Sequence, residues 1–310
     1  MSAQFWYIDK WSSSYTWGCV DDTCKPVAGD IVHIKSGQVI LLDESTPVLK
    51  LLLIDGGKMI WARKNGVELH MEYGVVNNNG SFEIGSEDEL FCSGSALIKM
   101  YGHQRSVNLL IYGAKVCAVR FGTLDIHGCP VTTTWSGLDG AVYPGDAEIA
   151  VTHVVENDWH IGNEIVVAAT GDITAWERSE KRKITAISGS RITLDRPLKY
   201  QHLGVCQNGP NNNGLGWGWA GELCMRAEVG LLTRNVKMTG NLNHVEQVET
   251  ARFEHETGSD QFGSVLFIHK VYHAKLAHFE VILSFFTHRA HYRHHTFVET
   301  KTCNKNLHSN

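Results

Sequence analysis

The sequence predicts an all-β protein in which coils of a right-handed parallel β-helix, or solenoid, flank an inserted small antiparallel β domain. Three observations predict this class. The 310 residues include 30 glycines and 6 prolines, which suits many short strands joined by tight corners. Short apolar runs closed by glycine recur at intervals of roughly 20–30 residues, about the length of one coil. A sustained 3.6-residue periodicity, which would indicate amphipathic helices, is absent.

The first predicted domain covers residues 1–129. Alternating apolar residues at 30–34 and an apolar run at 37–43 are separated by a glycine turn, which indicates a pair of strands. Glycine-closed apolar strands follow at residues 51–56, 80–85, 97–102 and 122–128. No such coil can bury its inner face alone, so we expect the coils to stack on their neighbours.

The second predicted domain covers residues 130–221. Its apolar runs at 159–168, 184–189 and 192–198 are short, with turns every 8–12 residues or so, which favours a small antiparallel barrel or sandwich. A loop rich in glycine and asparagine ends this region and carries Trp217 and Trp219.

The third predicted domain covers residues 222–310. Residues 222–240 contain a buried-looking Leu231–Leu232 pair and an alternation of Val236 and Met238, closed by Gly240. We expect continuing β-helix coils here, then a histidine-rich C-terminal tail, and an open solenoid edge through which the chain could assemble with a partner.

Two groups of residues resemble a known family. Residues 226–235 read Arg-Ala-Glu-Val-Gly-Leu-Leu-Thr-Arg-Asn, and eight glycines recur in the N-terminal part, at Gly29, Gly37, Gly56, Gly74, Gly80, Gly85, Gly94 and Gly102. Both resemble the fibrocystin-L-like surface proteins that carry the eight-glycine domain, a domain also found in cell-surface hyaluronan-degrading proteins. The resemblance covers about four-fifths of the chain.

This resemblance implies a non-catalytic extracellular or cell-surface module that binds glycans or other surface proteins, with a ciliary location as one alternative. A polysaccharide-acting, hyaluronidase-like β-helix enzyme is the alternative function. A histidine-containing phrase typical of the family after Ser284 is missing here, which argues against the enzyme. No cofactor is expected. The net charge of −5 gives no reason to expect a nucleic-acid partner, and no apolar run reaches the roughly 20 residues of a membrane-spanning helix.

The eight cysteines favour disulfides in an oxidising compartment, because their spacing fits no zinc site. Cys206 and Cys224 bracket the tryptophan loop and are the first expected pair; Cys19 and Cys24 are the second. The N-terminal residues lack the basic and apolar regions of a secretory signal, so the extracellular interpretation implies a mature protein or a fragment.

Trp217 and Trp219 are the candidate ligand-binding residues, because aromatic rings on a loop can stack on sugars or dock a partner. The alternative is that both rings cover an adjacent sheet. Asn79 begins the one Asn-x-Ser/Thr sequence and is either a glycan acceptor or a turn residue.

Two further groups of residues are candidates for metal binding or catalysis. Asp30, Asp43, Asp146 and Asp195 lie at or near turns, where they would bind calcium, act as an acid/base pair, or accept backbone hydrogen bonds; the last is favoured. His288, His291 and His294 would share one helix face as metal ligands, although a solvated tail is simpler. No residue is predicted to be catalytic, and whether a metal binds stays open.

Overall fold

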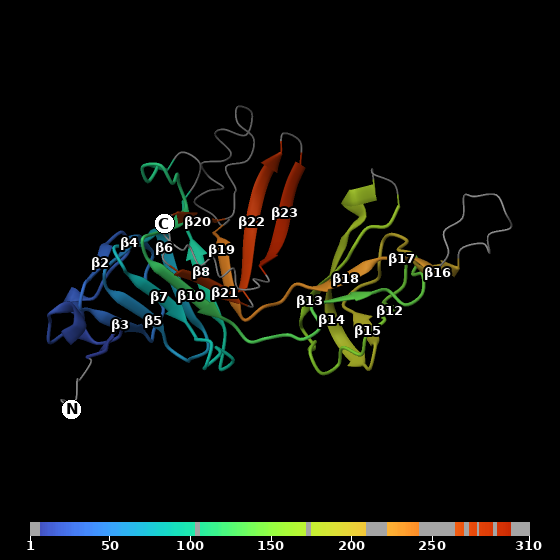
Figure 1. Cartoon of the computed structure of the whole chain (residues 1–310), viewed down its shortest axis with the longest axis horizontal. Helices are drawn as coiled ribbons and strands as arrows, with labels where there is room; N and C mark the ends of the chain where they lie inside the picture. Colours follow the sequence, from blue (N-terminus) through green and yellow to red (C-terminus); the bar gives the residue numbers. More distant parts are fainter. Residues whose placement is uncertain are drawn as a thin grey trace, which may run out of the picture. The chain divides into compact units, whose positions relative to one another are not determined.

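The computed structural model describes residues 7–102, 106–171, 175–208, 222–241, 264–269, 273–277, 279–287 and 290–298. The chain divides into two compact units. Unit 1 comprises Met1–Pro130 and Arg234–Asn310, and unit 2 comprises Val131–Thr233. Unit 2 is therefore inserted in the sequence of unit 1 (Figure 1). The three described helices are short 3₁₀ turns: η1 (Ser14–Trp17), η2 (Asp22–Cys24) and η3 (Ala175–Arg178).

The described strands of unit 1 form two sheets. In spatial order, the six-stranded sheet consists of β1 (Asp9–Lys10), β3 (Val39–Leu42), β5 (Lys58–Trp61), β7 (Ser81–Ile84), β10 (Thr123–His127) and β21 (His273–Ala277). The nine-stranded sheet consists of β2 (Ile31–Lys35), β4 (Leu49–Asp55), β6 (Val67–Asn77), β8 (Ala96–Met100), β19 (Val236–Gly240), β22 (Phe279–Thr287) and β23 (Ala290–Val298), with β9 (Val116–Arg120) on β6 and β20 (Val265–His269) on β9.

The two sheets of unit 1 share one hydrophobic core. Burial alternates along the strands, so Val32 and Ile34 of β2 face inward while their neighbours are exposed. Residues of the other sheet, such as Leu42 of β3 and Phe82 of β7, belong to the same buried cluster. The period-two pattern of the sequence thus places one face of each strand in the core.

Unit 2 is built from antiparallel strands. Its six-stranded sheet has the order β11 (Trp135–Gly137), β18 (Glu228–Leu231), β13 (Glu164–Val167), β14 (Glu180–Ser188), β15 (Arg191–Leu194) and β12 (Glu148–Ala150). A bridge between Leu138 and Val151 joins the chain just beyond the two outer strands. A separate two-stranded sheet pairs β16 (Gly204–Asn208) with β17 (Glu222–Arg226).

The predicted fold class is wrong in its main feature. The chain is all-β, but it is not a mostly parallel β-helix, because parallel and antiparallel pairing are both present. All pairings of the six-stranded sheet in unit 2 are antiparallel, and β22 pairs antiparallel with β23 in unit 1. Alternation and glycine corners predict where a strand begins and ends. They do not determine whether its neighbour runs parallel or antiparallel, which depends on how the connections cross.

Candidate functional site

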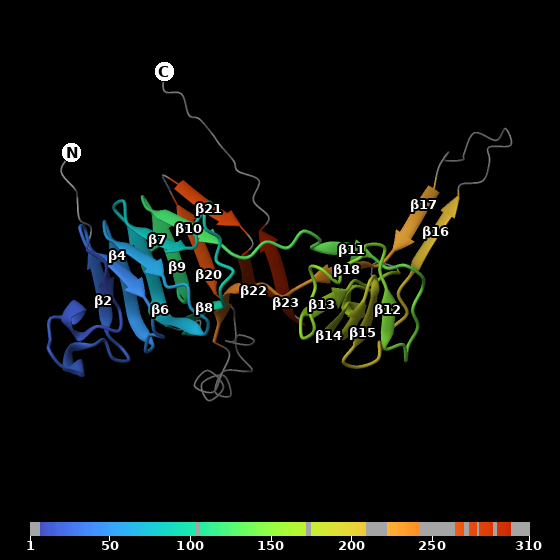
Figure 2. The same cartoon turned by 90° about the horizontal axis from the view of Figure 1, so that it is seen from below.

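The hairpin of β16 and β17 is the candidate functional site, because the predicted ligand-binding residues Trp217 and Trp219 lie in the sequence between its two strands. The two strands pair antiparallel with Cys206 directly opposite Cys224, and a disulfide joins these two residues. Figure 2 shows the ribbon extending away from the six-stranded sheet of unit 2. An isolated two-stranded hairpin is marginally stable in water, so the disulfide supplies a restraint that the pairing alone does not.

One face of the hairpin is apolar and exposed. Val205 lies opposite Met225, and Leu223 lies two residues before Met225, so the three side chains share a face. Their exposed fractions are 40% for Val205, 44% for Met225 and 41% for Leu223. Three large apolar side chains gathered on a two-stranded ribbon are a feature typical of a contact surface.

The opposite face anchors the hairpin to the rest of unit 2 through Arg226. Its Nη1 donates to the carbonyl oxygen of Leu138 and to Oδ1 of Asp139, each at 2.9 Å. Its Nε lies 3.0 Å from Sγ of Cys206. The guanidinium and the disulfide therefore fix the base of the hairpin while the apolar face stays in solvent.

Several predicted site residues lie outside the described residues. Trp217, Trp219 and His288 are among them, so their roles in binding stay predictions. His291 and His294 lie in strand β23 and not on the helix face expected for metal ligands. Among the described residues, no group of three or more His, Cys, Asp or Glu side chains could hold a metal ion.

Each of the four turn aspartates accepts a hydrogen bond from a backbone N–H group. Asp30 accepts the N–H of Val27 at 2.8 Å, and Asp146 accepts that of Tyr143 at 2.7 Å. Asp43 accepts the N–H of Ser12, and Asp195 that of Lys183, each at 2.9 Å. Each of the four carboxylates thus stabilises a turn or a strand connection.

Asn79 lies at the turn between β6 and β7 and is exposed. It adopts a positive φ of 65°, which asparagine tolerates better than most residues. Both the turn interpretation and the glycan interpretation fit this position, so glycosylation stays a prediction.

The expectation of disulfides is confirmed, with one pair that sequence proximity did not indicate. Besides Cys206–Cys224, the structure contains Cys19–Cys24 and Cys92–Cys129. Cys117, which lies near Cys129 in sequence, is a buried free thiol. Burial raises the pKa of Cys117 to about 12, so the thiol stays protonated and unreactive at neutral pH.

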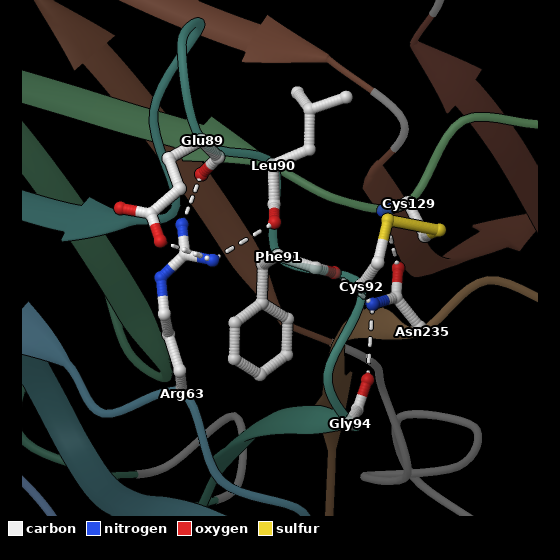
Figure 3. The surroundings of a disulfide bond; sticks show 8 residues. All are labelled: Arg63, Glu89, Leu90, Phe91, Cys92, Gly94, Cys129 and Asn235. Carbon is white, nitrogen blue, oxygen red and sulfur yellow. Dashed lines mark hydrogen bonds and ion pairs between the residues drawn. A yellow bond between two sulfur atoms is a disulfide. The ribbon is translucent and has the colours of Figure 1, made fainter.

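The Cys92–Cys129 disulfide lies next to the position where the chain leaves unit 1 (Figure 3). Oδ1 of Asn235 accepts the N–H of Cys129 at 2.9 Å. Nδ2 of Asn235 donates to the carbonyl oxygens of Phe91 and Gly94. Because unit 1 is interrupted after Pro130 and resumes at Arg234, Asn235 and the disulfide hold both ends of the interruption to the Phe91–Gly94 turn.

Comparison with known proteins identifies the family of the chain. Residues 16–139 match the G8 domain. Fibrocystin-L from Mus musculus and from Homo sapiens are each 37% identical to the chain over 86% of its length, and Fibrocystin from Canis lupus familiaris is 35% identical over 75%. The chain is a fibrocystin-L-like protein with a G8 domain. It spans about 6% of the length of the two Fibrocystin-L relatives.

The eight glycines of this fibrocystin-L-like chain occupy positions where a side chain is unfavourable. Five have a positive φ: Gly29, Gly37, Gly56, Gly85 and Gly102. At the other three, a Cβ atom would lie within 3 Å of a neighbouring heavy atom: Gly74, Gly80 and Gly94. The glycine pattern therefore follows from the turns and close backbone contacts of unit 1.

A buried ionic cluster in the fibrocystin-L-like chain was not predicted. Glu180 and Arg182 form an ion pair with side chains 3% and 4% exposed, and Nε2 of His202 lies 3.2 Å from Oε1 of Glu180. Burial alone would raise the pKa of Glu180, but hydrogen bonds from the backbone N–H groups of Lys199 and Tyr200 and from His202, together with the Arg182 charge, hold it below its ordinary value. The signal in the sequence was Glu180 and Arg182 two residues apart in a strand, on the face that carries buried Ile184.

None of the helices in the described parts of the chain is long and apolar enough to span a membrane.

Proposed function

We propose that this chain is a non-catalytic module of an extracellular or cell-surface protein, and that it binds glycans or other surface proteins through the β16–β17 hairpin. The observation that carries the proposal is the exposed apolar face of Val205, Leu223 and Met225 on a hairpin closed by a disulfide. Burying such a face in a partner would contribute roughly 25 cal/mol for each Å² of apolar surface removed from water.

Family and covalent structure support the extracellular part of the proposal. The relatives named above are Fibrocystin-L and Fibrocystin, which agrees with the surface proteins that the eight-glycine pattern resembles. Disulfides persist mainly in oxidising compartments, and three are present among the described residues.

The polysaccharide-cleaving alternative has no comparable support. Glycosidases use two carboxyl groups that face a common substrate site. The turn aspartates considered for this role are instead bonded to backbone N–H groups, which is the usual structural use of aspartate at a corner.

Two measurements on the whole chain test the proposal. Fluorescently labelled chain should bind intact cultured human cells, and prior treatment of the cells with protease or with glycosidases should show whether the partner is a protein or a glycan. Hyaluronan incubated with the chain, with and without calcium, should keep its size distribution. If the chain shortens hyaluronan, and if replacing one of the turn aspartates by asparagine abolishes this shortening, the enzyme function is established instead.

The double variant Trp217→Ala/Trp219→Ala tests the loop carried by the hairpin. We expect weaker cell binding and a nearly unchanged melting temperature, because exposed aromatics contribute to binding and little to folding. Unfolding of this variant would mean that the two rings are core residues and that the loop is a cover.

A further inference from the structure

A second surface of unit 2 has the character of a small anion site. A cavity of about 270 Å³ is lined by Ser179, Glu180, Lys181, Arg182, Arg196, Lys199 and Tyr200. All seven residues belong to β14, to the residue before it, or to the segment that follows β15. Cavities for drug-sized ligands start at about 300 Å³, so this one suits a single chemical group of a larger ligand.

The lining is positively charged on an acidic protein. Four of the seven residues are cationic and one is acidic, whereas the whole chain carries a net charge of −5. The net charge of the chain therefore repels anions. An anion would be attracted to this face only by the positive side chains that line the cavity.

The inner side of the cavity is held by the buried ion pair. Arg182 donates from Nε to the carbonyl oxygen of Arg196 at 3.2 Å and from Nη2 to that of Pro197 at 2.9 Å. Glu180 accepts the N–H of Lys199 and that of Tyr200 at 2.9 Å. The segment 196–200 is thus fixed against β14 from within, and the rim of the cavity is positioned before any ligand arrives.

The rim carries exposed positive charge. Lys199 is exposed and forms no ion pair within 4.0 Å among the described residues. Arg196 is 64% exposed; its Nε lies 4.0 Å from Oδ2 of Asp195, and its Nη2 donates to the carbonyl oxygen of Lys181 at 3.5 Å. Lys181 differs, because its Nζ lies 2.7 Å from Oε2 of Glu164. Lys199 and the exposed Arg196, whose ion pair is long, are therefore the lining cations that an anion could reach.

We propose that this cavity binds the sulfate or carboxylate group of an acidic saccharide, with Arg196 and Lys199 as the charged contacts. Tyr200, which is 41% exposed, offers a ring against which a sugar can pack. An extended acidic peptide that binds by main-chain pairing would need free backbone donors and acceptors at the rim. The N–H groups of Lys199 and Tyr200 already donate to Glu180.

Calorimetric titration of the whole chain tests this site with three probes: a heparin-derived hexasaccharide, a hyaluronan hexasaccharide and hexaglutamate. We expect at least one saccharide to bind, and binding to weaken as salt is raised from about 50 to 150 mM. Sulfate is the recognised group if only the heparin fragment binds, and carboxylate is sufficient if both bind. Hexaglutamate binding as tightly as the saccharides, or no binding by any probe, overturns the proposal.

Matched variants locate the site. Lys199→Ala and Arg196→Ala should each weaken saccharide binding by about tenfold, the effect of losing one charged hydrogen bond. Lys183→Ala removes the same charge from an exposed residue of β14 that does not line the cavity, and should change the affinity by less than about twofold. Equal losses from Lys183→Ala and Lys199→Ala would show that only the net charge matters, and would overturn the site.

This inference rests on the proposed role as a binding module, but it fails separately from it. If the saccharides do not bind while the labelled chain still binds cells, the cavity proposal alone is overturned. If the chain binds neither cells nor saccharides, the module proposal falls as well.

Discussion

At the scale of single residues, the glycines of unit 1 give the sharpest prediction. Gly85 and Gly66 have nearly the same φ, 71° and 74°, but differ in space. A Cβ on Gly85 would lie 2.7 Å from the carbonyl oxygen of His127 and 2.9 Å from the backbone nitrogen of Phe91, whereas nothing lies within 4 Å of a Cβ on Gly66. An alanine would therefore strain the backbone at both positions, but it would clash with neighbouring atoms only at position 85.

We expect Gly85→Ala to lower the free energy of unfolding by about 1–3 kcal/mol more than Gly66→Ala, as overpacking against backbone atoms does. Chemical denaturation of the two variants measures this difference. Equal losses would mean that the positive φ alone accounts for the need for glycine at position 85. The close contact would then be relieved by a small backbone shift.

The ionisation of Glu180 leads to a pH prediction. Its folded pKa is held below the ordinary value of 4.5, so the unfolded chain takes up a proton at a higher pH than the folded one. The stability that this group contributes is complete above about pH 4.5 and is lost as the pH falls through the folded pKa. Hydrogen exchange in strands β13–β15, followed as the pH is lowered from 7, should show unit 2 losing protection in this window.

Glu180→Gln is the test variant for that window, and Glu148→Gln, at an exposed residue, is the control. The first should be less stable at neutral pH and should show a flatter acid dependence. The control should follow the unmodified chain. An unchanged acid profile in Glu180→Gln would show that other carboxyl groups determine the acid sensitivity of unit 2.

At the scale of elements, the disulfide of the hairpin should determine whether β16 and β17 stay paired. Cys206 and Cys224 are 18 residues apart, and a closed loop of this size stabilises by about 3 kcal/mol on the chain-entropy estimate. We expect Cys206→Ser/Cys224→Ser to lower the stability of unit 2 and to open the hairpin to proteolysis. Cys19→Ser/Cys24→Ser, which removes a bond in unit 1, should leave cleavage at the hairpin unchanged.

The elements also show what the sequence could predict. Strand positions such as 31–35 and 81–84 follow from alternation and glycine corners, because those signals are local. Strand β18, expected among the parallel coils, instead pairs antiparallel with β11 and β13, because strand pairing is not a local property of the sequence. The Cys206–Cys224 pair could be proposed because both residues bracket one loop. The Cys92–Cys129 bond joins residues 37 apart, and only the fold brings them together.

At the scale of the whole molecule, the chain is a G8-containing unit interrupted by an antiparallel unit. Asn235 and the Cys92–Cys129 bond secure the ends of the interruption within unit 1. The eight-glycine pattern and the segment at 226–235 together predicted the family, and the structure shows why each of these glycines is needed by the backbone. The contact of His202 with Glu180 could not be predicted, because the two residues are 22 apart in sequence and only the fold brings them together.

The central claim is that the chain acts by binding through the apolar face of the β16–β17 hairpin. Flow cytometry of labelled chain on intact cultured human cells tests it, with Leu223→Ser/Met225→Ser compared with the control Val154→Ser/Ile161→Ser. The control removes two apolar side chains of unit 2 that are 60% and 71% exposed but lie outside the hairpin. We predict that the hairpin variant keeps its melting temperature and loses at least about fivefold in cell binding, because central apolar contacts dominate interfaces, while the control binds like the unmodified chain. Undiminished binding by a folded Leu223→Ser/Met225→Ser variant would contradict the account.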